Sequence, residues 1–187
     1  MTKDVFSDYE IDKQCIKFNN EETAHSLDCL GSCTQALESR TITKKCRGVV
    51  AKTRTVGTGN GTLKESLHIP QTVLVKAFGL THDTLKTDVQ AYGQLSRHEE
   101  FALTQHVIDE DGDEKYKCFP RCIIKDFPED KTENGSEEVA EREIEIALMP
   151  DEHGFCMYEV ILTESNKTEY EDWMENWDYS LVELPAL

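Results

Sequence analysis

Histidine and cysteine are the residues of this chain that most readily take part in catalysis, and two arrangements of them invite that interpretation. His98 is followed by Glu99 and Glu100, and His106 can be paired with Cys156. Neither arrangement is accompanied by a Gly-x-Ser-x-Gly, His-Glu-x-x-His or cysteine-protease signature. The sequence therefore predicts that the chain is not an enzyme, and no catalytic residue is assigned.

The seven cysteines are also candidate metal ligands. Cys118 and Cys122 fall on an expected strand, where a rise of about 3.3 Å per residue separates their Cα atoms by roughly 13 Å, too far to share one ion. A zinc set is the alternative, and it would be drawn from Cys29, Cys33, Cys15, Cys46 and His25. The spacing matches no known zinc finger, so we expect reduced thiols, no metal and no cofactor.

Two short motifs resemble ligand loops but fit turns better. Gly57-x-Gly59-x-Gly61 lacks the Gly-x-Gly-x-x-Gly spacing, and it is expected to join two strands rather than a strand to a phosphate-binding helix. The acidic run 109–114 has its glycine at the fourth position, whereas an EF-hand needs glycine at the sixth. Both motifs therefore predict hairpin turns.

Net charge excludes some functions before any fold is considered. The 187 residues hold 20 Lys and Arg against 37 Asp and Glu, a net charge of −17. So acidic a chain is not expected to wrap DNA or to bind anionic lipid. No run of about 18 apolar residues and no secretory signal are present, so we expect a chain made inside the cell without a membrane span.

The charge is distributed unevenly along the chain. Residues 1–93 are nearly balanced, whereas residues 94–187 carry almost all of the negative charge. A basic segment, 38–64, contains Arg40, Lys44, Lys45, Arg47, Lys52, Arg54 and Lys64 against the single acid Glu38. Copies that pack head to tail would bring such a segment onto an acidic face, and a merely solvated surface is the other explanation.

The basic segment is expected to form a hairpin arm that reaches beyond the body. Residues 40–55 are rich in Thr, Val and Lys and contain no proline, as in a long strand. Gly57, Gly59, Asn60 and Gly61 are placed at the turn, because Asn-Gly supplies the positive φ angles of a primed turn. Residues 62–69 are the return strand, with Glu65 as the exception on the apolar side.

The remaining elements are mostly strands. Pro70 and Gly79 bound a short helix, and residues 100–109 and 115–125 form a second hairpin in which Pro120 requires an edge or a bulge. Residues 1–20 suggest an arm or edge strand, 21–38 a weak helix or turn, and 155–163 a further strand. A capping box at Thr168 and Glu171, followed by spaced aromatic residues, suggests a C-terminal helix or docking segment.

Residues 138–149 alternate most regularly. Ile144, Ile146 and Leu148 share one side of the expected strand, and Glu141, Glu143 and Glu145 line the other. We expect these three glutamates to form either the wall of a lumen or the surface that receives the basic arm. A solvated sheet face is the ordinary alternative.

The order of these elements resembles the major tail tube protein of bacteriophages with long, non-contractile tails. The segments that carry the resemblance are 43–50, 57–63, 68–70, 78–80, 92–93, 96–103, 119–120 and 141–154. The resemblance covers about residues 38–162. It does not extend to residues 1–37, and seven cysteines are unusual for the family.

The resemblance implies a mainly β fold, a β-sandwich or barrel-like tail-tube domain with a flanking short helix and a long hairpin arm. Residues 1–37 would be an N-terminal inter-subunit segment, 38–165 the tube domain and 166–187 a C-terminal docking segment, all within one domain. Such a protein polymerises as stacked hexameric rings in the virion tail after synthesis in the host cytoplasm. Its partners would be its own copies, a tape-measure protein, and terminator and distal tail proteins, and double-stranded DNA would pass through the lumen without specific binding.

A monomeric acidic binding module is the principal alternative. Such a protein, of the anti-restriction or adaptor type, would mimic DNA with its carboxylates. A DNA mimic is expected to spread acids over its whole surface, however, and the 38–64 segment is basic. The arm therefore favours the self-assembling protein.

Overall fold

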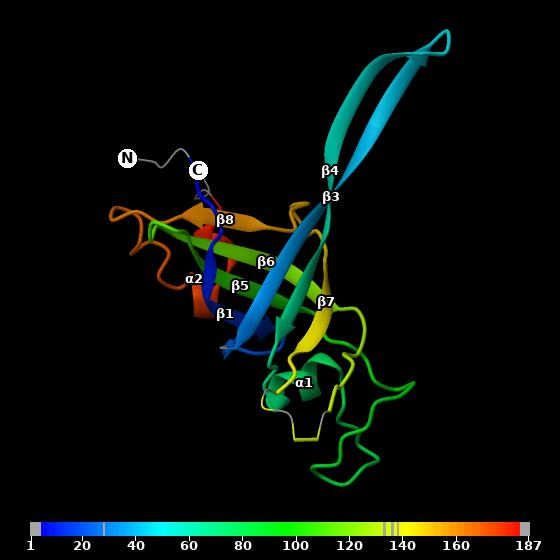
Figure 1. The fold of residues 1–187 in the computed structure, drawn as a ribbon, viewed down its shortest axis with the longest axis vertical. Coiled ribbons are helices and arrows are strands. Elements are labelled where there is room, and N and C mark those ends of the chain that lie inside the picture. The colour runs from blue at the N-terminus through cyan, green and yellow to red at the C-terminus, as the bar shows by residue number, and fades with distance from the viewer. Residues whose placement is uncertain (1–4, 28, 133, 136, 138, 184–187) are drawn as a thin grey trace.

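The computed structural model describes residues 5–27, 29–132, 134–135, 137 and 139–183. In chain order the elements are β1 (Glu10–Phe18), β2 (His25–Ser26), β3 (Leu30–Cys46), β4 (Val49–Leu67), α1 (Gln71–Ala77), β5 (Phe101–Ile108), β6 (Glu114–Ile124), β7 (Arg142–Leu148), β8 (Tyr158–Ile161), α2 (Trp173–Asn176) and a 3₁₀ turn (Tyr179–Leu181). The fold is mainly β, with one short helix flanking the sheet, as expected (Figure 1). Within this part of the chain, no helix has the length and apolar character needed to cross a bilayer.

All eight strands belong to one antiparallel sheet that curls over on itself. The order is β2-β1-β5-β6-β7-β4-β3, and β8 pairs with β6. Although β1 and β4 are far apart in that order, Gln14 Nε2 on β1 donates to Glu65 Oε2 on β4 at 3.0 Å. The two halves of the sheet therefore face each other and enclose the core between them.

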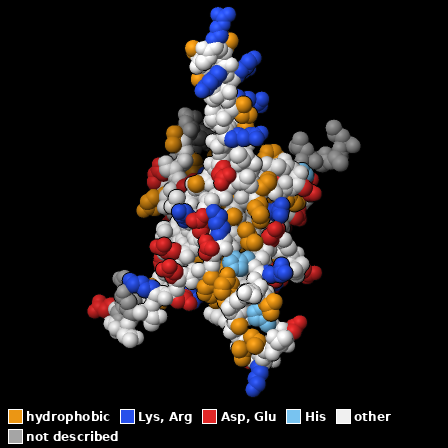
Figure 2. Space-filling model, turned by 90° about the vertical axis from the view of Figure 1, so that its right-hand side faces the viewer, with side chains coloured by type: hydrophobic (Ala, Val, Ile, Leu, Met, Phe, Trp, Pro, Cys, Tyr) orange, Lys and Arg blue, Asp and Glu red, His pale blue; other side chains and the backbone are white. Residues whose placement is uncertain are grey.

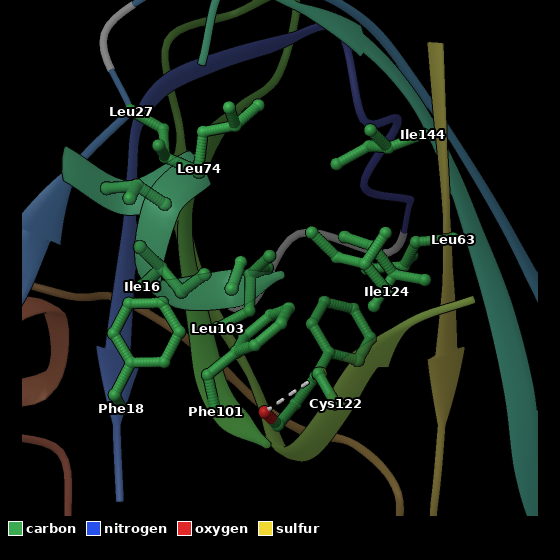
Figure 3. Packing of buried hydrophobic residues seen from close by; sticks show 14 of the residues in the cluster. Ile16, Phe18, Leu27, Leu63, Leu74, Phe101, Leu103, Cys122, Ile124 and Ile144 are labelled. Atoms are coloured by element: carbon green, nitrogen blue, oxygen red, sulfur yellow. Dashed lines mark hydrogen bonds between the residues drawn. The ribbon is translucent and has the colours of Figure 1, made fainter. Parts of the chain in front are cut away.

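The main core fills one end of this enclosure. Phe18, Phe101 and Phe119 are at most 1% exposed, and Leu63 and Leu67 meet them from β4. Figure 3 shows core side chains that include Phe18, Phe101 and Leu63 converging from several strands, with Leu74 of α1 packed across them. Burial of this apolar surface is the principal source of stability for the body.

Several elements lie where the sequence predicts them. The helix α1 follows Pro70, and Gly79 ends it with a φ of +57°. The β5–β6 hairpin pairs Ile108 with Glu114 across the expected turn. Pro120 lies in a bulge of β6, where Leu103 pairs with Phe119 but Phe101 pairs with Cys122, which accommodates the residue that cannot donate to the ladder.

The turn of the long hairpin is not where the sequence analysis placed it. Strands β3 and β4 pair from Leu30↔Leu67 to Cys46↔Val49, so the turn is Arg47-Gly48. Both residues have positive φ, +50° and +80°, as a two-residue primed turn requires. The four residues assigned to the turn, Gly57, Gly59, Asn60 and Gly61, instead lie inside β4.

The glycines of β4 serve a different purpose, at the point where the hairpin leaves the body. Ser39 pairs with Gly57 and Leu37 with Gly61, so β4 has more residues than β3 across this interval. Gly59 has a φ of +77°, and a Cβ at Gly61 would lie 2.8 Å from the carbonyl oxygen of Ala36. Glycine is therefore required by a bulge and a close backbone approach rather than by a turn.

Three other expectations are corrected. The segment 21–38, expected as a weak helix or turn, contains β2 and the first part of β3, so residue 37 lies in the middle of a strand. The preceding segment contains β1, which is part of the sheet. The capping box is absent: α2 begins after Asp172 without a side-chain cap. The strand expected over 138–149 is β7 alone, and Glu138 lies outside the described residues, as do 1–4 and 184–187 in the two terminal segments.

The C-terminal aromatic residues pack against the body of the chain. Trp173, Met174 and Trp177 pack with Cys15 of β1 and Cys118 of β6 in a second buried cluster. Thr104 Oγ1 donates to the carbonyl oxygen of Met174 at 2.8 Å. The segment that contains α2 therefore covers the face of β1, β5 and β6 that points away from the main core.

Candidate assembly surfaces

The outer part of the β3–β4 hairpin projects beyond the body as a free two-stranded ribbon, and residues 38–57 are called the arm below. Figure 1 shows it extending from one end of the molecule, opposite to α1. Every residue from 36 to 55 is exposed. The six cations assigned from the sequence lie around the true turn, and they are Arg40, Lys44, Lys45, Arg47, Lys52 and Arg54.

Strand register gives the arm two chemically different faces. Side chains of directly paired residues project on the same side of an antiparallel ribbon, and successive pairs alternate. One side, the cationic face, consists of the pairs Arg40↔Val56, Ile42↔Arg54 and Lys44↔Lys52. The other, the threonine face, consists of Thr41↔Thr55 and Thr43↔Thr53, and the hydroxyls of Thr41 and Thr55 lie 3.1 Å apart.

The cationic face has no counterions from the described part of its own chain. Lys44 and Lys52 are directly opposite each other, an arrangement of like charges that destabilises an isolated ribbon. Among the described residues, none of the arm's six cations lies within ion-pair distance of a carboxylate. Figure 2 shows Lys and Arg side chains along the arm and most of the Asp and Glu side chains on the body below.

The three glutamates assigned from the sequence lie together on the body. Glu143 and Glu145 are on the outer side of β7, whose inner side holds the buried Ile144 and Ile146, and Glu141 directly precedes the strand. They line a groove of about 710 Å³ between β7, the base of β4 and the loop that follows β6. This acidic groove also contains Asp126 and Glu129, while its lysines are Lys64 and Lys131.

Some carboxylates of the acidic groove already have partners within the chain. Glu145 is shared by Lys125 and Lys64, the latter at 3.6 Å, and the hydrogen bond from Lys125 lowers the pKa of that carboxyl. Ser66 Oγ donates to Glu141 Oε2 at 2.6 Å. Glu143 is exposed and has no ion pair with a described residue, so its carboxylate is available to bind a further cation.

The arm cannot reach the acidic groove of its own chain. Lys52 and Lys64 are twelve residues apart on the continuous strand β4. At about 3.3 Å per residue, Lys52 is therefore up to roughly 40 Å from the lysine that lines the groove, and Val56, at the near end of the cationic face, up to roughly 26 Å. A contact between the two surfaces requires two molecules.

The histidines and cysteines considered for catalysis have structural contacts. His98 Nδ1 lies 2.6 Å from the carbonyl oxygen of Ile124, and its ring packs edge-on against Phe78. His106 lies between Asp12 and Glu114, at 3.2 and 3.0 Å. Cys156 belongs to the main core, where burial raises the pKa of its thiol.

The alternative zinc ligands are not brought together. Cys46 is beside the turn of the arm, whereas Cys15 is buried under the C-terminal segment. Cys118 and Cys122 pack into different cores, because the bulge at Pro120 turns the strand between them. No group of three metal-ligating side chains is found among the residues that the structure describes.

A polar cluster inside the curled sheet was missed by the sequence analysis. Gln14, Glu65 and Gln105 are at most 3% exposed and bond to one another, and Cys33 Sγ lies 3.6 Å from Glu65 Oε1. Burial raises the pKa of Glu65 to about 7. The one sequence signal was Glu65 itself, a carboxylate on the apolar side of an alternating strand.

This cluster adjoins a cavity of about 660 Å³ beside β3. Its walls are the N-terminal residues Asp8 and Tyr9, the start of β3 around Cys33, and Gln105 and Lys117 from β5 and β6. The enclosure formed by the sheet is therefore apolar at the α1 end and polar at the end nearer the arm.

Comparisons with known proteins give a limited result. No family model matches the chain, and no curated protein matches it. Among solved structures, a chain from the anti-feeding prophage baseplate is 11% identical with a TM-score of 0.46, covering 86% of this chain and 97% of that one. A chain from the anti-feeding prophage tube terminating cap is 11% identical with a TM-score of 0.47, covering 87% and 98%. Membership of the tail-tube family therefore stays a prediction.

Proposed function

We propose that this chain is a structural subunit of a phage-like tail that polymerises as stacked rings, with the hexameric rings of the resembled family as the expected form. The tube would be the conduit for genome delivery, and the chain would act as a virion protein rather than an enzyme. The observation that carries the proposal is the arm. It is an exposed cationic ribbon that has no counterion among the described residues, and it cannot reach the acidic groove of its own molecule.

The contact proposed between subunits joins the cationic face of one arm to the acidic groove of a neighbouring copy. A contact of the same kind already exists within one chain, because Lys64, which like Lys52 and Arg54 lies on β4, is 3.6 Å from Glu145. Arg40, Lys44, Lys52 and Arg54 would bring additional cations to Glu141, Glu143 and Asp126. Opposite charges set orientation and register at such a contact, and each surface meets a different surface, as ring and stack formation requires.

The remaining partners follow from the same proposal. The ends of a tube would contact terminator and distal tail proteins, and a tape-measure protein would occupy the lumen during assembly. DNA would pass through without specific binding, since the body is strongly acidic and repels phosphate. The chain would be synthesised in the host cytoplasm and incorporated into the tail of the virion.

Negative-stain microscopy and sedimentation of the concentrated protein test the proposal. The native chain should form rings or tubes, and Lys44→Gln/Lys52→Gln/Arg54→Gln should abolish them without unfolding the body. Thr41→Glu/Thr43→Glu/Thr53→Glu is the matched control, because it changes the net charge equally on the threonine face and should leave polymers. A native chain that is monomeric at every concentration would overturn the proposal and favour the acidic binding module.

A further inference from the structure

The N-terminal residues 5–9, called the strap below, cross the polar end of the sheet and are held there chiefly by one carboxylate. Asp8 lies between two lysines of β6, with Oδ1 2.8 Å from Lys115 Nζ and Oδ2 in contact with Lys117 Nζ. Phe6 lies 4.5 Å below Lys115 Nζ, and Tyr9 N–H donates to the carbonyl oxygen of Ile108. By contrast, Val5 and Tyr9 are 67% and 75% exposed, so the strap has little apolar anchoring.

The two lysines are unusual because they are buried. Each is only 7% exposed, on the inner side of β6. Lys115 has a second carboxylate, Glu159, at 3.5 Å. Among the described residues, Lys117 has only the neutral Gln35 amide oxygen, at 3.3 Å, besides Asp8. A buried ammonium without a counterion is costly, so this site requires a carboxylate at the position that Asp8 occupies.

The strap also closes one side of the cavity beside β3. Residues 30–35 of β3 line this cavity, and β3 is the last strand of the described sheet, so its edge away from β4 pairs with no described strand. Unpaired edges bind further strands readily, and proteins usually cover them. Removal of the strap would open the cavity beside this edge and expose two buried cations at the same end of the molecule.

We propose that the strap is an electrostatic latch: Asp8 holds it over the cavity in the free chain, and a carboxylate of a neighbouring copy replaces Asp8 during assembly. The latch itself stands on the contacts above, while its role in assembly rests on the proposed function. In the free chain the latch closes one side of the cavity and keeps the lysine pair occupied. In the polymer the lysine pair becomes a second inter-subunit contact of the same chemistry as the arm and groove, but with the cations buried.

Cys33 reports the state of the latch without any need for assembly. It lines the cavity, and burial together with the Glu65 carboxylate raises the pKa of its thiol to about 12, so its labelling is expected to be slow while the strap is closed. The experiment uses dilute protein with Cys29→Ser and Cys46→Ser, because these two thiols are exposed. Asp8→Asn removes the charge of the latch, and Asp12→Asn, which leaves the lysine pair untouched, is the control.

We expect Asp8→Asn to raise the labelling rate of Cys33 roughly tenfold, since two charge-assisted bonds are lost. We also expect it to lower the protein concentration at which polymers form, and we expect Asp12→Asn to change neither quantity. Unchanged labelling in Asp8→Asn would overturn the latch. Faster labelling with an unchanged polymerisation threshold would overturn the role of the latch in assembly. If every variant, like the native chain, stays monomeric, the proposed function is overturned. The labelling result would then still test the latch itself.

Discussion

The molecule contains two long antiparallel hairpins that differ in how their charges are satisfied. In the β5–β6 hairpin, Lys115 and Lys117 bind Asp8, and Arg121 binds Glu100 at 3.1 Å. The cations of the β3–β4 arm have no such partners in the described chain. These cations of the first hairpin are paired within the described chain, while the second hairpin presents cations that are open to solvent or to another molecule.

Burial differs in the same way. Phe119 and Leu103 of the β5–β6 hairpin are fully buried, whereas Ile42, Val49 and Val50 of the arm are 52–70% exposed. The stability of the body therefore depends on β5–β6, and the arm is free to change its contacts without unfolding the protein. This separation is what an assembling subunit requires, because it must fold before its neighbours arrive.

The largest effect expected from this comparison is on stability. Phe119→Ala should lower the free energy of unfolding by about 3–5 kcal/mol, because it leaves a cavity in the core. Ile42→Ala, on the arm, should change it by less than about 0.5 kcal/mol. Urea unfolding followed by tryptophan fluorescence measures both, and similar losses for the two variants would show that the arm is part of the cooperative unit.

The second effect concerns the buried Glu65. Its pKa is raised from 4.5 to about 7. Between pH 4.5 and 7, Glu65 is therefore protonated in the folded state but ionised in the unfolded state. Stability should therefore fall as pH rises from about 4.5 to 7, by up to about 3 kcal/mol. Glu65→Gln should remove this fall, and the exposed control Glu143→Gln should keep it. An identical pH dependence of unfolding in Glu65→Gln and the native chain would contradict the assignment.

The third effect is local and tests the position of the turn. Gly48 has a φ of +80°, so Gly48→Ala should destabilise the arm hairpin by about 1 kcal/mol. Gly57→Ala meets no atom within 4 Å and should be tolerated. Amide hydrogen exchange over residues 40–55 should be faster in Gly48→Ala than in the native chain and unchanged in Gly57→Ala. Faster exchange in Gly57→Ala alone would instead support a turn at residues 57–61.

The smallest effect separates the isolated arm from the assembled one. Lys52→Glu places a carboxylate opposite Lys44 and should stabilise the ribbon in the monomer by about 0.2–1 kcal/mol, which slows its hydrogen exchange. The same substitution should weaken polymerisation, because the cationic face loses charge. A variant that both orders the arm and strengthens the polymer would show that arm order, rather than charge, limits assembly.

Local patterns in the sequence predicted much of the fold. Alternation identified the inner and outer sides of β7, and Pro70 and Gly79 bounded α1. Pro120 required an edge or a bulge, and the structure has the bulge. The position of the arm turn was wrong because the local rule favours Asn60-Gly61, whereas the actual turn, Arg47-Gly48, places a non-glycine residue at positive φ. Pairing of residues 61–67 with β7 decides between them, and that long-range register cannot be read from the turn itself.

The candidate surfaces were predicted only in part. The basic segment and the glutamates of β7 are contiguous in sequence and could be found, but the two faces of the arm depend on the register between β3 and β4. The strap and the lysine pair could not be found, since Asp8 and Lys117 are more than a hundred residues apart and both look like ordinary surface residues. Their burial is a consequence of how the sheet curls.

Mixing two complementary variants tests the central claim most directly. Lys44→Glu/Lys52→Glu/Arg54→Glu reverses the cationic face, and Glu141→Lys/Glu143→Lys/Glu145→Lys reverses the acidic groove. Each variant alone should stay unpolymerised, and an equimolar mixture should form polymers in which the two alternate, as seen by sedimentation and microscopy. A mixture that remains monomeric while the native chain polymerises would contradict the pairing of arm and groove between copies.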